Sequence, residues 1–421
     1  MTIPTPATTN PIYNEFWQRP ADEIDAALAE IRDQGGVVFF PEPEVPPEIP
    51  IPQGPGSWVL TNHADILAVS KSPDVFSSAA GITVGDLPPE FVEFFSSMIA
   101  MDDPRHARLR RLVSAGFTPR MLAKLDDSIQ TVARGIVDQV APKGEIDFVV
   151  DVAAALPLKI VCDLMGVPDD QFRFVFDRTN VILGASDPEY VAEEADILTA
   201  LLTAVADLAA LMERVAEEKR GGDGKDLTSI LINAELEDDE LSPADLASFF
   251  ILLVVAGNET TRNSISWALK YLTDNPDQRE IWAADFEGVG PSAVEEIVRL
   301  ASPVTYMRRT ALSDTEIGGQ AIAAGQKVCM FYLAGNRDPL VFDDPLAFNV
   351  RRDPNPHIGF GGPGPHFCLG AHLARRQILV MFRELFSRLP DIHASGEPEL
   401  LRSSFIHGIK HLPATFTPVE V

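Results

Sequence analysis

Helical periodicity dominates the sequence and extends from Arg105 to Leu300 with few helix-breaking residues. Strong helix formers such as Ala, Leu, Glu and Arg fill this stretch, which predicts a mainly α fold. The clearest predicted helices are Ala107–Ala115, Met121–Val140, Tyr190–Lys219 and Pro243–Thr273. Short strand patterns occur at Ser57–Thr61 and between Arg309 and Tyr332, where a hairpin around residues 316–320 precedes an extended segment at residues 327–331. Small β-sheets are therefore expected beside the helices.

The chain shows no linker, repeat or low-complexity segment, which predicts a single domain over residues 1–421. Its 62 acidic and 34 basic residues give a net charge of −28, a field that repels phosphate and disfavours nucleic acid as a partner. The longest apolar run, Phe249–Ala256, is far shorter than the roughly 20 residues of a membrane span. Residues 1–14 lack the basic start and apolar core of a signal peptide. We expect a soluble, cytoplasmic monomer without a membrane span.

The three cysteines occur in different surroundings. Cys162 and Cys329 lie in apolar runs and are expected in the core. Cys368 instead follows a loop rich in glycine and proline at residues 356–365 and precedes an amphipathic helix. A thiolate at this junction faces the positive end of the helix dipole, which lowers the pKa of the thiol. The glycines also let the loop backbone lie close to a flat macrocycle.

A thiolate ligand on haem iron favours cleavage of the O–O bond, which is the chemistry of a monooxygenase. A buried cysteine beside a glycine-rich turn is the simpler alternative. A phosphate-binding loop is a second alternative, but no Gly-Lys-Ser/Thr follows, and the net charge is negative. The stretch from Asn336 to Pro365, which has almost no periodicity and leads directly to Cys368, favours a functional loop.

The predicted helix from Pro243 is unusually long and has a polar break in its middle. Ser242 suits its N-cap, Asn275-Pro276 ends it, and its length is on the order of 45 Å. After an apolar run, residues 258–262 are Asn-Glu-Thr-Thr-Arg. The Thr260 hydroxyl can bond back to a carbonyl one turn earlier, and Gly257 gives the backbone room to open a groove. The alternative is a helix that emerges into solvent here, but apolar residues resume after Ser264.

Two of these motifs resemble the cytochrome P-450 family. Gly364, His366, Cys368 and Gly370 match the haem-binding loop of that family, and Ala256-Gly257-x-Glu259-Thr260 is similar to its oxygen-activating signature. The resemblance implies a P-450 fold in which haem b lies between the long central helix and the cysteine loop, with Cys368 as iron ligand and Thr260 and Glu259 as catalytic residues. One difference is Gly361, which stands where the family usually has the Phe; Phe360 lies one position earlier.

The resemblance also assigns roles to charged residues. Glu296 and Arg299 match a structural pair that a further Arg completes; Ala347 occupies the usual place of that Arg, which leaves Arg351 or Arg352 to replace it. Taken alone, the pair could equally be a solvated surface ion pair. The cations at positions where the family binds the haem propionates are His106, Arg110, Arg309 and His366.

The resemblance covers the chain from about Phe39 onward, with residues 1–36 as a variable N-terminal segment. It is closest to mycobacterial P-450 enzymes that hydroxylate the terminal methyl of methyl-branched lipids, with relatives that act on sterol side chains. The implied substrate is a long apolar molecule, such as a branched lipid, an isoprenoid or a sterol side chain. Candidate pocket residues, each of which could instead belong to the core, are Phe95, Met98, Ile99, Leu183, Val304 and Phe405.

The sequence contains no flavin or nicotinamide motif, so electrons are expected from outside, from a ferredoxin and its reductase as in soluble bacterial members of the family. A candidate docking patch for an acidic ferredoxin consists of Arg108, Arg110, Arg111, Arg375 and Arg376. Two other functions stay open, a peroxygenase that uses peroxide directly and a non-catalytic haem-based sensor. The Glu259-Thr260 pair argues against the first, and the lack of any output domain argues against the second.

Overall fold

The computed structural model describes residues 9–44, 52–86, 97–114, 117, 119–185, 187–192, 196–233 and 243–420. The chain forms two compact units. Unit 1 contains Met1–Leu109, Glu295–Leu369 and Arg402–His407, and unit 2 contains Arg110–Val294, Gly370–Leu401 and Gly408–Val421. Both units combine helices with small sheets, which confirms the predicted fold class. The prediction of one domain over residues 1–421 stays a prediction.

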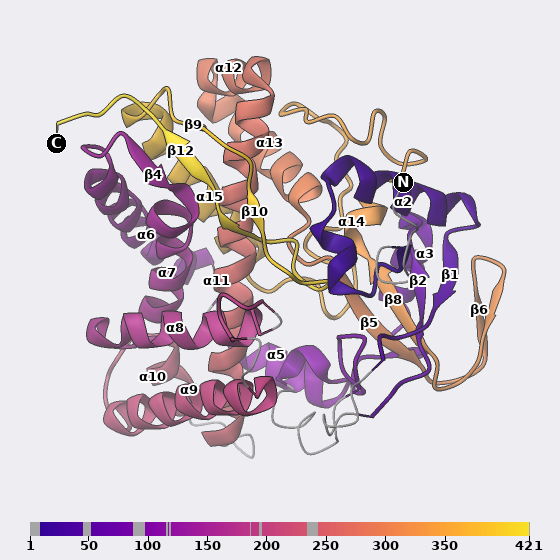
Figure 1. The fold of residues 1–421 in the computed structure, drawn as a ribbon. Helices are drawn as coiled ribbons and strands as arrows, with labels where there is room; N and C mark the ends of the chain where they lie inside the picture. Colours follow the sequence, from indigo (N-terminus) through magenta and orange to yellow (C-terminus); the bar gives the residue numbers. More distant parts are fainter. Residues whose placement is uncertain are drawn as a thin grey trace. The chain divides into compact units, whose positions relative to one another are not determined.

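A five-stranded sheet forms the centre of unit 1 (Figure 1). Its strands lie in the order β1 (Val37–Phe40), β2 (Ser57–Leu60), β8 (Lys327–Phe331), β5 (Tyr306–Ala311) and β3 (Phe76–Ser77). Strands β2 and β8 are parallel, and the other neighbours are antiparallel. Because β8 is the middle strand, all five of its residues are buried. The hairpin predicted before β8 consists of β6 (Thr315–Ile317) and β7 (Gln320–Ile322).

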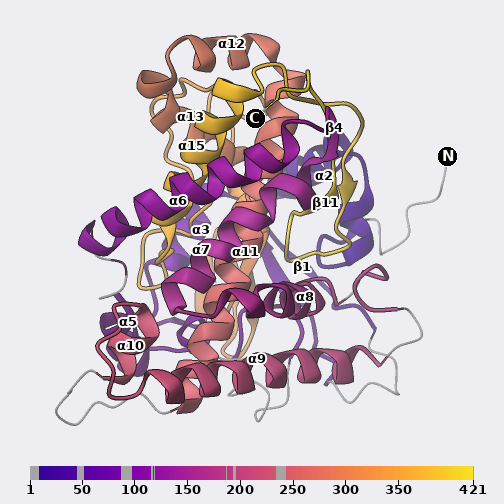
Figure 2. The ribbon, with the colours of Figure 1, turned by 90° about the vertical axis from the view of Figure 1, so that its left-hand side faces the viewer.

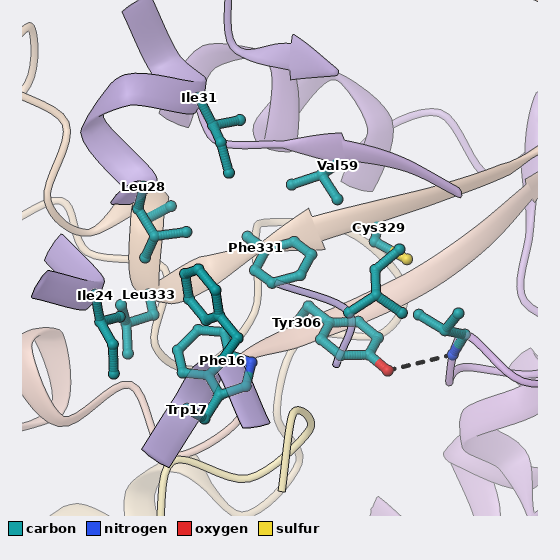
Figure 3. Packing of buried hydrophobic residues seen from close by; sticks show 13 residues of the cluster. Phe16, Trp17, Ile24, Leu28, Ile31, Val59, Tyr306, Cys329, Phe331 and Leu333 are labelled. Carbon is teal, nitrogen blue, oxygen red and sulfur yellow. Dashed lines mark hydrogen bonds between the residues drawn. The ribbon is translucent and has the colours of Figure 1, made fainter. Parts of the chain in front are cut away.

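The helical elements of unit 1 are short and come from its N-terminal segment and from its segment Glu295–Leu369. They are η1 (Asn14–Gln18), α2 (Ala21–Asp33), α3 (His63–Ser70), η2 (Met98–Ala100) and α14 (Tyr332–Gly335). Helices α5 (Arg105–Ser114) and α13 (Phe286–Ala301) each begin in one unit and end in the other. Figure 3 shows how η1 and α2 pack on the sheet, with Trp17 stacked on Phe331 at 6.3 Å between ring centroids and Phe331 stacked on Tyr306 at 5.0 Å.

Unit 2 is mainly helical, and α11 (Pro243–Asp274) packs against α7 (Ala155–Met165) and α9 (Ile197–Lys219), as Figure 2 shows. Helix α15 (Ala371–Arg388) packs against α6 (Pro119–Val140). The other helical elements are the π-helix η4 (Val149–Ala153), η5 (Asp169–Gln171), α8 (Phe172–Leu183), α10 (Leu227–Ile232) and α12 (Pro276–Ala284). Two small sheets contain β4 (Glu145–Asp147), β12 (Pro413–Thr415) and β9 (His393–Ala394), and β10 (Glu399–Leu400) with β11 (Ile409–His411).

The predicted start of one helix is wrong, and several strands escaped prediction. The helix predicted from Tyr190 begins only at Ile197, because the Asp196 side chain accepts hydrogen bonds from the backbone N–H groups of Leu198 and Thr199 and so caps it. The Tyr190 N–H instead donates to the Asp187 carbonyl in a turn. The strands that were not predicted are short: β1 has four residues, β3 has two, and those of unit 2 have two or three each.

Candidate active site

The loop that carries Cys368 closes on itself through backbone hydrogen bonds. The Cys368 N–H donates to the Phe360 carbonyl at 3.0 Å, and the Gly361 N–H donates to the Ile358 carbonyl at 2.9 Å. Gly361 has a φ of +83°, a conformation that a Phe side chain would strain, which gives a physical reason for the glycine where the family usually has Phe. At Gly364 a Cβ would lie 2.3 Å from the Ser70 carbonyl oxygen, so that position requires glycine too.

Exposure and position distinguish Cys368 from the other cysteines. Burial raises the pKa of both Cys162 and Cys329 to about 12, so neither is suited to form a thiolate. Cys368 is partly exposed and lies just before Gly370, the N-cap of α15. A Cβ added to Gly370, two residues after the cysteine, would meet no atom within 4 Å. A partly exposed thiol just before the first turn of a helix fits a thiolate ligand of haem iron.

Arg309 provides a second test of whether haem fits. Its guanidinium is buried, donates to the Arg308 carbonyl at 2.7 Å, and forms no ion pair with any carboxylate in the described part of the chain. Burial lowers the pKa of Arg309, and the electrostatic effects of Tyr332 and the Asp102 carboxylate offset this only in part. A buried cation without an acidic partner is costly, so it suits an anionic ligand group such as a haem propionate.

Two histidines of unit 1 lie together, as expected for a shared ligand. The rings of His106 and His366 are 4.2 Å apart between centroids. His366 Nε2 is 3.1 Å from the Ser78 hydroxyl, and His106 Nδ1 is 3.3 Å from an Asp103 carboxylate oxygen. Arg110 follows His106 by one turn of α5 and belongs to unit 2. The residues of unit 1 thus fit haem, with Cys368 for the iron and Arg309, His106 and His366 for the propionates.

The Glu296–Arg299 pair is a buried network and not a surface ion pair. Arg299 donates to both oxygens of Glu296, at 2.7 and 2.9 Å, and both side chains have no exposed area. Arg352 Nε lies 3.1 Å from each of the same oxygens. Of the two candidates that the sequence left open, Arg352 therefore completes the network, while Arg351 is exposed. Helix α13 is tied in this way to the segment that leads to Cys368.

The polar break of α11 lies inside unit 2, since Asn258, Glu259 and Arg262 are all buried and the helix continues to Asp274. The Thr260 hydroxyl donates to the Ala256 carbonyl at 2.7 Å, and Ala256 itself is exposed. This back-bonding occupies the carbonyl one turn earlier, as the sequence predicts. Gly257 faces α7, where a Cβ would approach Val161 to 2.9 Å.

Only one carboxylate oxygen of Glu259 accepts hydrogen bonds from the described residues. Its Oε1 accepts hydrogen bonds from Arg262 and, at 2.9 Å, from Asn263 Nδ2. Its Oε2 is buried and has no hydrogen-bond partner among the described residues. Asn263 also accepts from the Ile409 N–H at 3.0 Å, which links α11 to β11, and Arg262 donates to Asn180 on α8 at 3.2 Å. Arg262 and Asn263 were not predicted as site residues, although their spacing of three and four residues from Glu259 was an available signal.

A cavity of about 390 Å³ in unit 2 reaches Arg262. Its polar lining includes Asn180, Glu189, Tyr190, Lys410 and His411. Burial raises the pKa of Tyr190 to about 12, so the phenol stays protonated in the physiological range. The cavity therefore brings polar groups from α8, β11 and the turn at Tyr190 to the partner of Glu259.

The predicted substrate residues are not gathered into one site by the described contacts. Phe95 lies outside the described residues. In unit 1, Met98 is buried, Ile99 is partly buried, Val304 bridges to Ile406, and Phe405 packs against Tyr306 at 5.6 Å. Leu183 is the last residue of α8 in unit 2. Their role as a substrate pocket stays a prediction.

No helix in the described ranges is both long and apolar enough to cross a membrane. A family model described as Cytochrome P450 matches residues 198–281 and 291–393. The chain is 46% identical over 406 residues to the methyl-branched lipid omega-hydroxylase of Mycobacterium tuberculosis (strain ATCC 25618 / H37Rv), covering 96% of this chain and 93% of that protein. It is 40% identical over 367 residues to the steroid C26-monooxygenase of Mycolicibacterium smegmatis, covering 86% and 84%.

Among solved structures, Mycobacterium marinum cytochrome P450 CYP268A2 in complex with pseudoionone is similar, with a TM-score of 0.91, 44% identity and coverage of 96% of this chain and 97% of that chain. Similarity of this extent reaches well beyond the motifs that the sequence analysis used. It includes both the loop of Cys368 and the polar break of α11. The chain belongs to the cytochrome P450 family and is a monooxygenase, an oxidoreductase that hydroxylates its substrate.

Proposed function

We propose that this monooxygenase binds haem b through Cys368 and hydroxylates the terminal methyl of a methyl-branched lipid, an isoprenoid or a sterol side chain. The observation that carries the haem site is the partly exposed Cys368 on a closed loop before α15, together with the buried Arg309 of the same unit, which forms no ion pair in the described chain. The substrate class is supported by two relatives, one named as a methyl-branched lipid omega-hydroxylase and the other as a steroid C26-monooxygenase. Methyl-branched lipids and steroids are both apolar.

In the proposed reaction, one atom of O2 enters a C–H bond of the substrate and the other leaves as water, while two electrons and two protons are taken up. When bound, the haem supplies the iron at which O2 is activated, and a thiolate ligand favours O–O cleavage. Arg309, His106, His366 and Arg110 would hold its carboxylates through charge-assisted hydrogen bonds.

Glu259 and Thr260 would handle the protons. The Oε2 atom of Glu259 can hold a proton without disturbing the Oε1 atom, which Arg262 and Asn263 keep in place. The polar cavity beside Arg262 offers these protons a source in solvent. Thr260 is the next residue. Its hydroxyl donates a hydrogen bond to the Ala256 carbonyl, and the hydroxyl oxygen can accept a hydrogen bond from another group.

Electrons would come one at a time from a ferredoxin that its reductase serves, and the protein would work as a cytoplasmic monomer. In the predicted docking patch, Arg376 forms an ion pair with Asp126, which raises the pKa of Arg376 and neutralises part of its charge. Arg108 and Arg111 on α5 are exposed, so an acidic partner can reach both of them. Charge reversal at Arg108 should slow electron transfer at low salt; an unchanged rate would refute the patch.

The deciding experiment is the absorption spectrum of the reduced protein with carbon monoxide. The wild type should give the red-shifted Soret band of a thiolate ligand, Cys368→Ser should lose it, and Cys162→Ser should keep it. Reconstituted turnover of a branched fatty acid, an isoprenoid and a sterol should then give terminal alcohols. Products hydroxylated along the chain would contradict the proposed regiochemistry, and turnover with peroxide alone would favour a peroxygenase.

A further inference from the structure

Helix α13 anchors the irregular segment before the Cys368 loop at successive points. Arg299 donates to the carbonyls of Asn336, Pro345 and Ala347 at 2.8, 2.7 and 3.1 Å. Glu296 accepts from the Asn349 N–H at 2.9 Å and from Asn355 Nδ2 at 3.2 Å. The final side-chain anchor in chain order belongs to His357, eleven residues before Cys368 in the sequence.

His357 makes two contacts that fix its protonation state. Its Nε2 lies 2.8 Å from Glu295 Oε2 on α13, and its Nδ1 lies 3.1 Å from the Gly359 backbone nitrogen. A backbone N–H can only donate, so Nδ1 must accept and the ring proton must be on Nε2, where it donates to Glu295. Only 4% of the His357 side chain is exposed, so water does not replace either contact easily.

The backbone links the contact between His357 and Gly359 to Cys368. Gly359 lies tightly against α13, since a Cβ there would be 2.7 Å from the Val298 carbonyl oxygen. The next residue is Phe360, whose ring lies 5.8 Å from the His357 ring and whose carbonyl accepts the Cys368 N–H. His357 therefore fixes the amide of Gly359, and Gly359 fixes the carbonyl that holds the cysteine backbone.

We propose that His357 is a positioning residue for the thiolate ligand and acts in its neutral form with the proton on Nε2. The proposal rests on ligation of haem by Cys368. The side-chain contacts of His357 in the described part of the chain are with Glu295, Gly359 and Phe360, so its effect on the cysteine is indirect. A merely structural histidine would stabilise the fold without altering how firmly the thiolate stays bound.

Three substitutions separate the two contacts. In His357→Asn the amide oxygen occupies the place of Nδ1 and can still accept from Gly359, whereas in His357→Gln the amide nitrogen occupies the place of Nε2 and can still donate to Glu295. Glu295→Gln keeps an oxygen that accepts from Nε2–H and is expected to be silent. The matched control is His407→Ala, which removes another buried histidine that contacts α13, at the Ala301 carbonyl, 2.6 Å from its Nδ1.

The readout is the rate at which the carbon monoxide complex of the reduced protein loses its thiolate Soret band to the band of the neutral thiol, measured together with the thermal midpoint. His357→Ala and His357→Gln should speed this loss roughly three- to tenfold, the effect of one hydrogen bond. His357→Asn and Glu295→Gln should stay near the wild-type rate. His407→Ala should lower the thermal midpoint while leaving the rate unchanged.

Equal rates for His357→Gln and wild type, or an effect of His407→Ala as large as that of His357→Ala, would overturn the positioning role. A large effect of Glu295→Gln would show a charged pair and overturn the assigned tautomer. If His357→Ala fails to bind haem, the Asn and Gln variants still decide, because each keeps one contact. A wild type without a thiolate band would instead refute ligation by Cys368, an outcome distinct from these.

Discussion

Replacing Arg352 with Ala tests the network that the structure places around Glu296. Arg352 donates to both carboxylate oxygens of Glu296 and to three backbone carbonyls of the preceding segment, at 2.7–3.1 Å. The substitution removes all of these donors, and the Asp343 and Asp344 carbonyls lose their Arg352 partner. Arg351 is the matched control, since it is the adjacent residue, has the same charge and is exposed.

The size of the effect follows from what remains after the substitution. Removing one partner of a buried ion pair costs about 3–5 kcal/mol, most of it from the charge left behind. Here Glu296 keeps the two hydrogen bonds from Arg299, one from the Asn349 N–H and one from Asn355 Nδ2, so we expect the low end, about 3 kcal/mol of unfolding free energy. Arg351→Ala should change the unfolding free energy by no more than about 0.5 kcal/mol.

Urea unfolding of the two variants and the wild type, followed by circular dichroism, measures these differences. Arg352→Lys should recover little, because one ammonium group cannot span both Glu296 and the backbone carbonyls as a guanidinium does. Equal midpoints for Arg352→Ala and Arg351→Ala would refute the assignment of Arg352. A larger loss with Arg351→Ala would show that the other candidate completes the network.

Three further predictions concern both units. Asn263→Ala should loosen Glu259 and raise the share of O2 released as hydrogen peroxide severalfold, since a hydrogen bond to a charged group contributes about 1.5–3 kcal/mol; unchanged coupling would contradict the role of the asparagine. Burial lowers the pKa of His411, but the hydrogen bonds and charges of Asp147 and Glu189 together outweigh it, and the net shift is upward. The stability that His411 contributes is therefore present below pH 6.5 and is lost as the pH rises through the raised pKa of the folded state. His411→Ala should accordingly lower the unfolding free energy more in acid than in base, and a loss that does not depend on pH would contradict this prediction. In the folded protein stripped of haem, iodoacetamide should label Cys368 before the two buried thiols, whose pKa values are about 12, and equal labelling would contradict the assignment.

Local pattern was enough to predict the helical class, the long helix α11 and the loop of Cys368. The hydrogen bond from Thr260 to Ala256 connects residues four apart, so helical geometry alone implies it. The choice between Arg351 and Arg352 depends on how an irregular segment turns toward α13, and adjacent residues of one type carry no sequence signal for that. The bond from the Ile409 N–H to Asn263 joins positions 146 residues apart, which no local pattern can predict.

The same spacing of Glu and Arg occurs in two buried pairs of the described chain and serves two different purposes. Glu296 and Arg299, and Glu259 and Arg262, are each three residues apart on a helix, and all four side chains are buried. Glu296 accepts hydrogen bonds at both oxygens from Arg299 and Arg352, so a proton on either oxygen would displace a donor. Such a carboxylate is suited to holding backbone segments in place.

Glu259 has its donors on Oε1 alone, and Oε2 has none in the described part of the chain. A buried oxygen without a partner is unfavourable unless water or a proton reaches it, and Arg262, which holds the other oxygen of Glu259, lines a polar cavity. Protonation of Oε2 would leave the contacts of Oε1 intact. The number of oxygens that carry donors, and not the Glu-x-x-Arg spacing itself, therefore separates the carboxylate that maintains the fold from the one suited to deliver protons.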